Sequence, residues 1–376
     1  MIYNFQAALT VINGTAWSYF FKKSAIFNMF VIFKSQNPHQ IEGQPTNRTE
    51  GHPSTQNHKL CETTMNKTAL SLAIVAMIPT MANAQDEGDV LDFYGKANVT
   101  FQAADEGDGS ETDVQSNASR LGVKGEIALT DGIKGIYRME YEVDMDGDAD
   151  DTFSQRNIYA GLEGGFGQVI AGKFDTPLKV AQKKVDLFND LEGDIKSLIT
   201  SSDNREEDAL QYTTPSFAGF KASTAYISNK GEVINEETGE ERNNGISASV
   251  AYDNNGVFMA YAFDQDVEGQ DIDVQRFVAQ YNIGPVQVGA LFEDQEDAAG
   301  NSTDGWMGSV AYKIEQWTMK AQYGQSDIKK EGGETYSLGL DYKFNSSAKV
   351  FGFYTDETAD GDYDRSYAGI GAEYKF

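Results

Sequence analysis

Hydrophobic and polar residues alternate with a period of two from Leu91 to the end of the chain, in segments of about ten residues. The segment from Ile133 to Val143 shows the pattern clearly, because apolar or small residues take every second position. Its opposite face is charged and carries Lys134, Arg138, Glu140 and Glu142. Such alternation is typical of a β-strand that separates two different environments. The pattern therefore predicts an all-β protein.

The alternating segments number sixteen, and the connections between them fall into two classes. The segments start near residues 91, 118, 133, 153, 167, 208, 219, 244, 256, 271, 285, 305, 317, 333, 348 and 364. Short turns alternate with long, mostly acidic connections at 103–117, 176–207, 228–243 and 295–304. A soluble sandwich does not usually sort its loops in this way, whereas a membrane barrel does. We predict a 16-stranded antiparallel transmembrane β-barrel over residues 85–376.

An export signal precedes the barrel segment. Residues 65–84 combine a basic start at Lys67, an apolar run and an Ala-Asn-Ala ending, so we predict a signal peptide that is cleaved after Ala84. Residues 1–64 are interpreted as an upstream extension from a misplaced start codon, with a genuine leader or short anchor as the alternative. No apolar run of about 18 residues follows Ala84, which argues against a spanning helix there.

Charge and composition restrict the possible functions. The chain has 58 Asp and Glu against 30 Lys and Arg, and the 292 residues after Ala84 carry 55 acidic and 24 basic side chains. This balance argues against a nucleic-acid partner. The only cysteine and all three histidines precede residue 85, which removes triads based on them, thiol chemistry and most zinc sites from the barrel segment. We therefore expect no enzymatic activity, no cofactor and no metal.

One acidic loop leaves an alternative open. Asp144, Asp146 and Asp148 have the spacing of the first ligands of a calcium-binding EF-hand loop. Ala149 and Gln155 stand where such a loop needs its glycine and its closing glutamate. A solvated acidic loop is favoured over a weak divalent-cation site.

Short motifs throughout 91–376 resemble, in order, strands of the trimeric Gram-negative general-diffusion porins. These motifs lie at 91–96, 119–126, 156–162, 167–173, 210–215 and 217–220. The ending Tyr374-Lys-Phe376 is similar to the family's terminal sequence, whose last aromatic residue is recognised by the barrel-assembly machinery. The resemblance implies a multi-pass homotrimer in the outer membrane, in contact with lipid and lipopolysaccharide.

The resemblance also implies a constriction. In this family the third loop folds into the barrel opposite a ladder of basic residues, and here the connection 176–207 takes that place. The acidic candidates are Asp186, Asp190, Glu192 and Asp194. The basic candidates are Lys96, Arg120, Arg156 and Arg205 from the resemblance, together with Arg138 from the alternation. The loop lacks the Pro-Glu-Phe-Gly-Gly run of the best-known members, so which carboxylates line the gap stays open.

The resemblance implies passive diffusion of small hydrophilic solutes and ions through a water-filled channel. Opposed charges across a narrow gap sort solutes electrostatically without binding them tightly. Because acidic residues dominate, we expect cations to pass preferentially. The alternatives are a substrate-specific channel and a surface barrel that acts as an adhesin or receptor. An outer-membrane enzyme ranks third.

Overall fold

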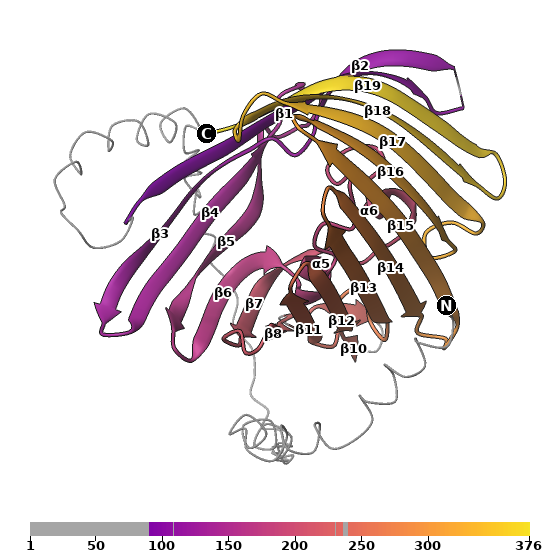
Figure 1. Cartoon of the computed structure of the whole chain (residues 1–376). Helices are drawn as coiled ribbons and strands as arrows, with labels where there is room; N and C mark the ends of the chain where they lie inside the picture. The colour runs from indigo at the N-terminus through magenta and orange to yellow at the C-terminus, as the bar shows by residue number, and fades with distance from the viewer. Residues whose placement is uncertain (1–89, 108, 230, 236–239) are drawn as a thin grey trace, which may run out of the picture. The chain divides into compact units, whose positions relative to one another are not determined.

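The structure is a computed structural model that describes residues 90–107, 109–229, 231–235 and 240–376. The predicted extension over 1–64, the signal peptide over 65–84 and the cleavage site at Ala84 lie outside the described residues. The described part is a β-barrel whose strands run around a central space (Figure 1). No helix within the described residues is long and apolar enough to cross a membrane.

Sixteen antiparallel strands of the described residues form the barrel, and most connect to the next by a hairpin. They are β1 (Asp92–Asp105), β3 (Arg120–Thr130), β4 (Ile133–Val143), β5 (Phe153–Gly164), β6 (Gly167–Asp175), β7 (Arg205–Thr213), β8 (Phe220–Ile227), β11 (Gly245–Asn254), β12 (Val257–Gln265), β13 (Asp273–Ile283), β14 (Val286–Glu296), β15 (Ser302–Ile314), β16 (Trp317–Ser326), β17 (Gly333–Lys343), β18 (Ala348–Ala359) and β19 (Tyr363–Lys375). The predicted 16-stranded barrel is confirmed, and each strand starts within three residues of its predicted position.

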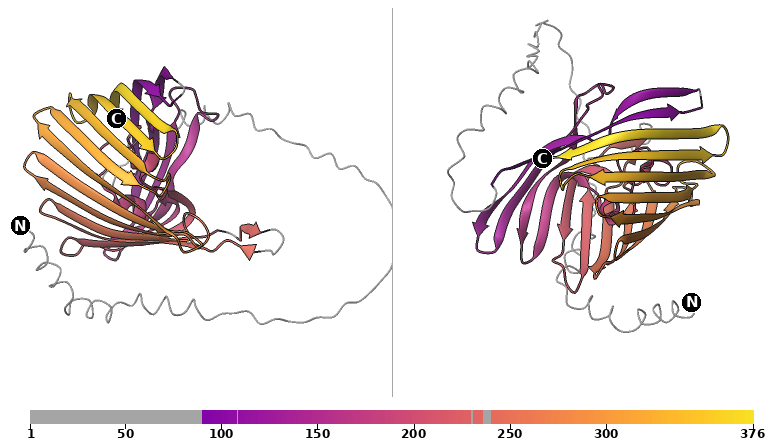
Figure 2. Two further views of the ribbon diagram at one scale, coloured as in Figure 1. Left: turned by 90° about the vertical axis from the view of Figure 1, so that its right-hand side faces the viewer. Right: turned by 45° about the horizontal axis from the view of Figure 1, so that its top comes forward.

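One strand of the barrel sheet and a small separate hairpin were not predicted. β2 (Ser110–Ser116) pairs with the second half of β1, while β3 pairs with the first half of β1 on the same side. Between β2 and β3, Ser119 Oγ accepts the Asn98 N–H at 2.9 Å and donates to the Asn98 carbonyl at 3.0 Å. The predicted long connection 103–117 is therefore wrong, because most of it continues the β1 ladder. A separate two-stranded hairpin, β9 (Val233–Asn235) and β10 (Glu240–Glu241), projects from the barrel (Figure 2).

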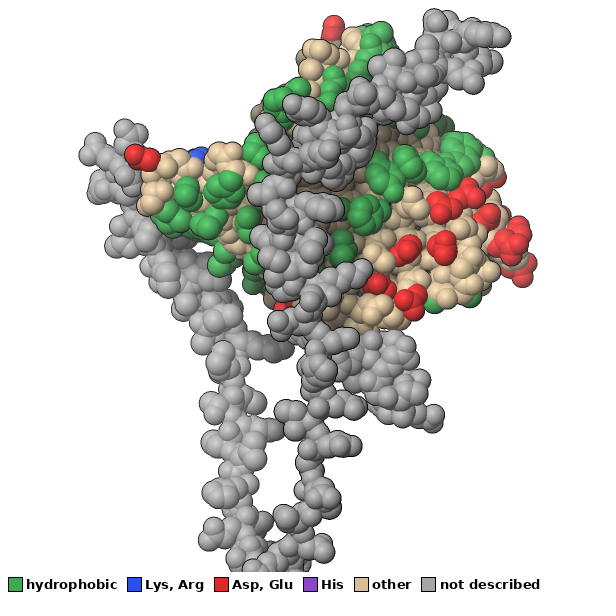
Figure 3. Space-filling view, turned by 90° about the horizontal axis from the view of Figure 1, so that it is seen from below, with side chains coloured by type: hydrophobic (Ala, Val, Ile, Leu, Met, Phe, Trp, Pro, Cys, Tyr) green, Lys and Arg blue, Asp and Glu red, His purple; other side chains and the backbone are tan. Residues whose placement is uncertain are grey.

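The two faces of the strands differ as the alternation predicted. Along β13, Val274, Arg276 and Val278 are buried, whereas Phe277 and Tyr281 are 50% and 42% exposed. Large hydrophobic side chains are exposed in the same way on most other strands, which gives the outer surface an apolar wall. In Figure 3 hydrophobic side chains spread across this wall, and acidic side chains gather at one end of it. An apolar outer band is what lipid contact requires.

The third loop, residues 176–204, folds into the barrel, as predicted. It contains two short helices, α5 (Pro177–Ala181) and α6 (Ile195–Leu198), which lie inside the ring of strands (Figure 1). Its side chains Leu178, Val185, Ile195 and Ile199 are fully buried against inward-facing apolar residues of β12 to β15. Burial of one such side chain is worth about 1.5–3 kcal/mol, so the inward position of the loop is a hydrophobic docking.

Close approach of β5 and β6 requires glycine at position 161. A Cβ atom on Gly161 would lie 2.0 Å from the carbonyl oxygen of Val169, whereas one on Gly352 would lie no closer than 3.7 Å to any atom. We expect Gly161→Ala to destabilise the barrel by about 1–3 kcal/mol, because the strands must separate. Denaturant unfolding of the detergent-solubilised barrel measures this. Gly352→Ala is the control and should unfold like the wild type; equal losses in the two variants would contradict the prediction.

Candidate pore constriction

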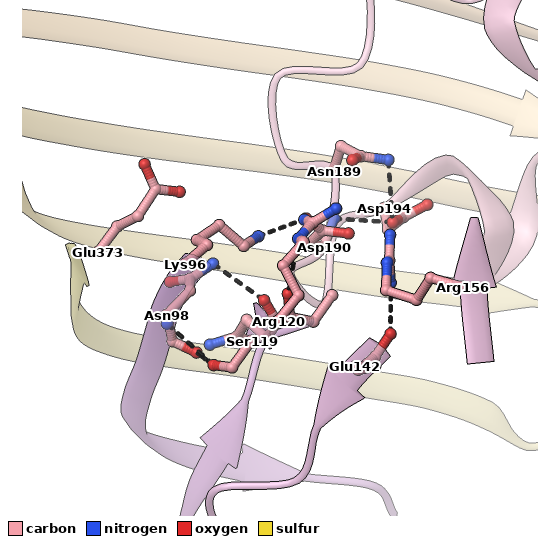
Figure 4. A network of polar contacts seen from close by, with 12 residues as sticks. Lys96, Asn98, Ser119, Arg120, Glu142, Arg156, Asn189, Asp190, Asp194 and Glu373 are labelled. Carbon is pink, nitrogen blue, oxygen red and sulfur yellow. Dashed lines mark hydrogen bonds and ion pairs between the residues drawn. The ribbon is translucent and has the colours of Figure 1, made fainter. Parts of the chain in front are cut away.

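The third loop meets the opposite wall of the barrel at Asp190. Its carboxylate lies 2.7 Å from Lys96 Nζ on β1 and 2.8 Å from Arg120 Nη2 on β3 (Figure 4). The side chains of Asp190 and Lys96 are only 17% and 9% exposed, so the contact is shielded from bulk water. The structure thus brings together one predicted acidic residue and two predicted basic ones.

The other three predicted acidic residues do not contact the basic wall directly. Asp186 accepts the N–H groups of Phe188 at 2.9 Å and Ile195 at 3.1 Å, and is buried within the loop. Asp194 caps α6 and accepts the Asp190 N–H at 2.8 Å. Both carboxylates therefore stabilise the backbone of the loop. We expected Asp186 to face the pore, but it is buried within the loop instead. Glu192 accepts a hydrogen bond from Gln102 Nε2 of β1 at 2.8 Å.

Two further predicted basic residues, Arg156 and Arg205, form ion pairs with acidic residues of the barrel strands. Arg156 of β5 contacts Glu142 and lies 3.0 Å from Glu140, both on β4. Arg205, the first residue of β7, lies 2.8 Å from Asp175. Neither residue forms an ion pair with the loop acids within the described part of the chain.

Arg138 lies outside this cluster, although it faces the same side. Its partner across the ladder is Lys124, whereas the partner of Lys96 is Arg120. Lys124 and Arg120 are four residues apart on β3, which corresponds to about 13 Å along a strand. Arg138 is thus too far toward the turn end of the barrel to reach Asp190, and it contacts tyrosine rings instead.

A cavity of about 550 Å³ borders the contact between the loop and the wall. Its charged lining consists of Arg120, Arg156, Lys179, Lys183, Lys196 and Arg205 with Glu142, Asp175, Asp190, Glu192, Asp194 and Asp203. Basic and acidic side chains are thus equal in number, and most of them are ion-paired. This part of the lumen is strongly polar and carries no formal net charge.

Two loop carboxylates of this cavity have pKa values shifted in opposite directions. Burial alone would raise the pKa of Asp190, but Lys96 and Arg120 hold it below the ordinary value. Burial raises the pKa of Glu192, which has no ion pair with a base within the described residues. Acidification therefore discharges Glu192 before Asp190.

Comparison with known proteins identifies the family. A model described as Gram-negative porin matches residues 69–376. The chain belongs to this family. Over 354 residues the porin is 24% identical to the major outer membrane protein P.IB of Neisseria meningitidis serogroup A, a match that covers 83% of this chain and all of that protein. The porin is thus an outer-membrane protein.

Solved structures support the fold of this porin. An anion-selective porin from Comamonas acidovorans has a TM-score of 0.64 at 21% identity, over 76% of this chain and 99% of that chain. The trimer form of in-vitro folded OmpT, an outer membrane protein of Vibrio cholerae, has a TM-score of 0.59 at 19% identity, over 77% of this chain and all of that chain.

The residue that anchors the loop of this porin was missed by the sequence analysis. Arg276 of β13 is fully buried; its Nε lies 2.6 Å from Glu293 of β14, and its Nη atoms donate to Leu178 O at 3.3 Å and Thr200 Oγ1 at 2.9 Å. Arg276 therefore forms hydrogen bonds with both the start and the end of the third loop. The available signal was an arginine flanked by Val274 and Val278 on the inward face of β13.

We expect Arg276→Met to release the third loop of the porin. The change leaves Glu293 buried without its partner, which costs about 3–5 kcal/mol. Single-channel conductance should rise and become noisy, and proteolysis should cleave within 176–204. The double variant Arg276→Met/Glu293→Leu removes both charges and should behave more like the wild type. Identical conductance in the wild type and the single variant would contradict the anchoring role.

The Glu192 pKa predicts a pH-dependent selectivity. Because this pKa is raised above 4.5, lowering the pH protonates Glu192 at a higher pH than a free glutamate and removes one negative charge from the cavity. Reversal potentials in a salt gradient should therefore move toward anion preference as the pH falls from about 7 to about 4. The Glu192→Gln variant should show a smaller shift, because it has no carboxylate to protonate at this position. Superimposable pH profiles for wild type and variant would contradict this assignment.

Proposed function

We propose that this porin forms a water-filled channel through which small hydrophilic solutes and ions diffuse passively, with a preference for cations and without chemical conversion. The observation that carries the proposal is the charged cavity beside Asp190, Lys96 and Arg120, inside a closed barrel whose outer wall is apolar. Polar walls favour hydrated solutes, and opposed charges sort them by dipole and charge.

Cation preference is supported by where the acidic excess lies. The cavity lining is balanced, so the surplus of Asp and Glu in the barrel segment belongs to other regions. Two groups of acidic side chains gather at the loop end: Asp144, Asp146, Asp148, Asp150 and Asp151 in one, and Asp266, Asp271, Asp273, Glu296 and Asp297 in the other, with Arg242 as a basic neighbour of the second. A mouth of one charge sign raises the local concentration of counter-ions. The anion-selective neighbour is 21% identical and shares the fold alone.

The assembly and location of the porin form part of the same proposal. We propose a homotrimer, by analogy with the trimer form of the Vibrio cholerae protein. Its apolar wall would contact lipid, and the loops at the extracellular end would contact lipopolysaccharide. Tyr374, on the last strand, and Phe376, directly after it, are 54% and 66% exposed, which suits recognition by the barrel-assembly machinery. Heat-modifiable migration on a gel, as trimer and then as monomer, tests the trimer.

Export through the signal at 65–84, with cleavage after Ala84, completes the proposal. Mass spectrometry of the protein purified from outer membranes should find a mature chain that begins at Gln85. Peptides from residues 1–64 in that material would contradict the upstream-extension hypothesis.

We expect neutralisation of the cavity bases to strengthen the cation preference. Arg120→Gln/Arg156→Gln removes two of the six basic side chains that line the cavity and leaves its acids in excess. The cation-to-anion permeability ratio from planar-bilayer reversal potentials should rise by about twofold or more. Lys134→Gln is the control, because Lys134 pairs with Glu126 and does not line the cavity. Anion preference in the wild type, or an equal change in the control, would contradict the proposal.

A further inference from the structure

Arg138 lies between two tyrosine rings and has no acidic partner among the residues that the structure describes. Its guanidinium carbon lies 5.8 Å from the ring centre of Tyr94 and 5.9 Å from that of Tyr159. Among the described residues no carboxylate lies within ion-pair distance of Arg138, and its Nε is a buried donor without a partner. The other predicted basic residues of the lumen are all ion-paired. The guanidinium of Arg138 is therefore available to form an ion pair with a group from outside the described chain.

The pairing register of the strands places Arg138 next to the two tyrosine rings. Lys124, Arg138 and Tyr159 are direct partners on β3, β4 and β5, so their side chains share the inward face. Tyr94 reaches them from β1 because Gly122 leaves room: a Cβ there would lie 2.6 Å from the ring carbon Cζ. We call Tyr94, Lys124, Arg138 and Tyr159 the basic-aromatic shelf.

Hydrogen bonding and packing fix the rings of the shelf. The Tyr94 hydroxyl donates to Glu140 Oε2 at 2.8 Å, and Glu140 is itself held by Arg156. Tyr159 packs edge-to-face on Phe174 with ring centres 6.3 Å apart, and both belong to an apolar cluster on the inner wall. The shelf thus offers a guanidinium without an ion-pair partner in the described part of the chain, next to an apolar surface of the inner wall.

Lys124 supplies a second, weaker positive charge. Its Nζ lies 5.4 Å from the Tyr94 ring centre and 3.2 Å from Asp92, and the lysine and aspartate side chains are 46% and 43% exposed. Because Asp92 offsets Lys124, the uncompensated charge of the shelf belongs to Arg138. A guanidinium presents a planar set of N–H donors that matches a carboxylate, and aromatic rings accept a flat apolar body.

We propose that the basic-aromatic shelf is a transient binding site for small aromatic carboxylates on the turn side of the constriction. The carboxylate pairs with Arg138, and the ring of the solute lies against Tyr94 or Tyr159. The inference rests on the proposed channel function, because the solute must enter the lumen to reach the shelf. It gives a cation-preferring pore a local route for one class of organic anion.

Current block by benzoate, with acetate as the non-aromatic comparison, tests the proposal on the full-length porin in planar bilayers. Wild-type current in potassium chloride should fall saturably with benzoate and much less with acetate. The half-blocking concentration should rise about tenfold in Arg138→Gln, because the charge-assisted hydrogen bonds are lost. Arg138→Lys keeps the charge without the planar donor set, so it should retain the reversal potential but weaken the block.

Lys134→Gln is the matched control, since it removes one positive charge from the same strand and from a residue that is not part of the shelf. Its benzoate block should equal that of the wild type. Absence of saturable block in a conducting wild type, or an equal weakening in Arg138→Gln and Lys134→Gln, would overturn the shelf and leave the channel proposal intact. Absence of any potassium chloride current would instead overturn the channel proposal itself. Normal potassium chloride conductance in each variant confirms that it has folded.

Discussion

The structure depends on the hydrogen-bonded seam between its first and last barrel strands. β1 and β19 pair antiparallel from Lys96 opposite Lys375 to Asp105 opposite Ser366, and Gly95 and Phe376 exchange two further backbone hydrogen bonds of 2.9 and 3.1 Å. In hydrocarbon an unpaired N–H or C=O costs several kcal/mol, so an open sheet edge is not tolerated. The seam removes that edge and encloses a lumen.

The inner surface of the closed barrel has two sides of different character, and the third loop contacts both of them. The inward side of β12 to β15 carries an apolar cluster that receives the hydrophobic side chains of the loop, and Arg276 of the same wall donates hydrogen bonds to both ends of the loop. The opposite side, formed by β1 to β5, is charged, so the tip of the loop presents Asp190 to Lys96 and Arg120. Docking on one wall therefore determines which acid meets the other wall.

Period-two alternation was sufficient to predict the strands and the orientation of most side chains, because both follow from local sequence. It could not predict β2, whose mostly polar sequence resembles a loop but whose backbone extends the β1 ladder. Nor could it separate Asp190 from Asp186, since the role of a loop carboxylate depends on which N–H groups the folded loop brings to it. Arg138 shows the same limit: its face was predictable, but its height along the barrel axis is set by register.

The distribution of charge underlies the selectivity that we propose. In the cavity beside the loop, basic and acidic groups are equal in number and many are paired at about 3 Å, so their fields largely cancel beyond a few ångströms. The acidic groups at the loop end have few basic neighbours and act together on an approaching ion. Such a field is screened over about 8 Å at physiological ionic strength. The cation preference that we propose would therefore weaken as salt rises, whereas discrimination by size and dipole at the paired constriction would persist. Ionic strength alone would separate the two contributions.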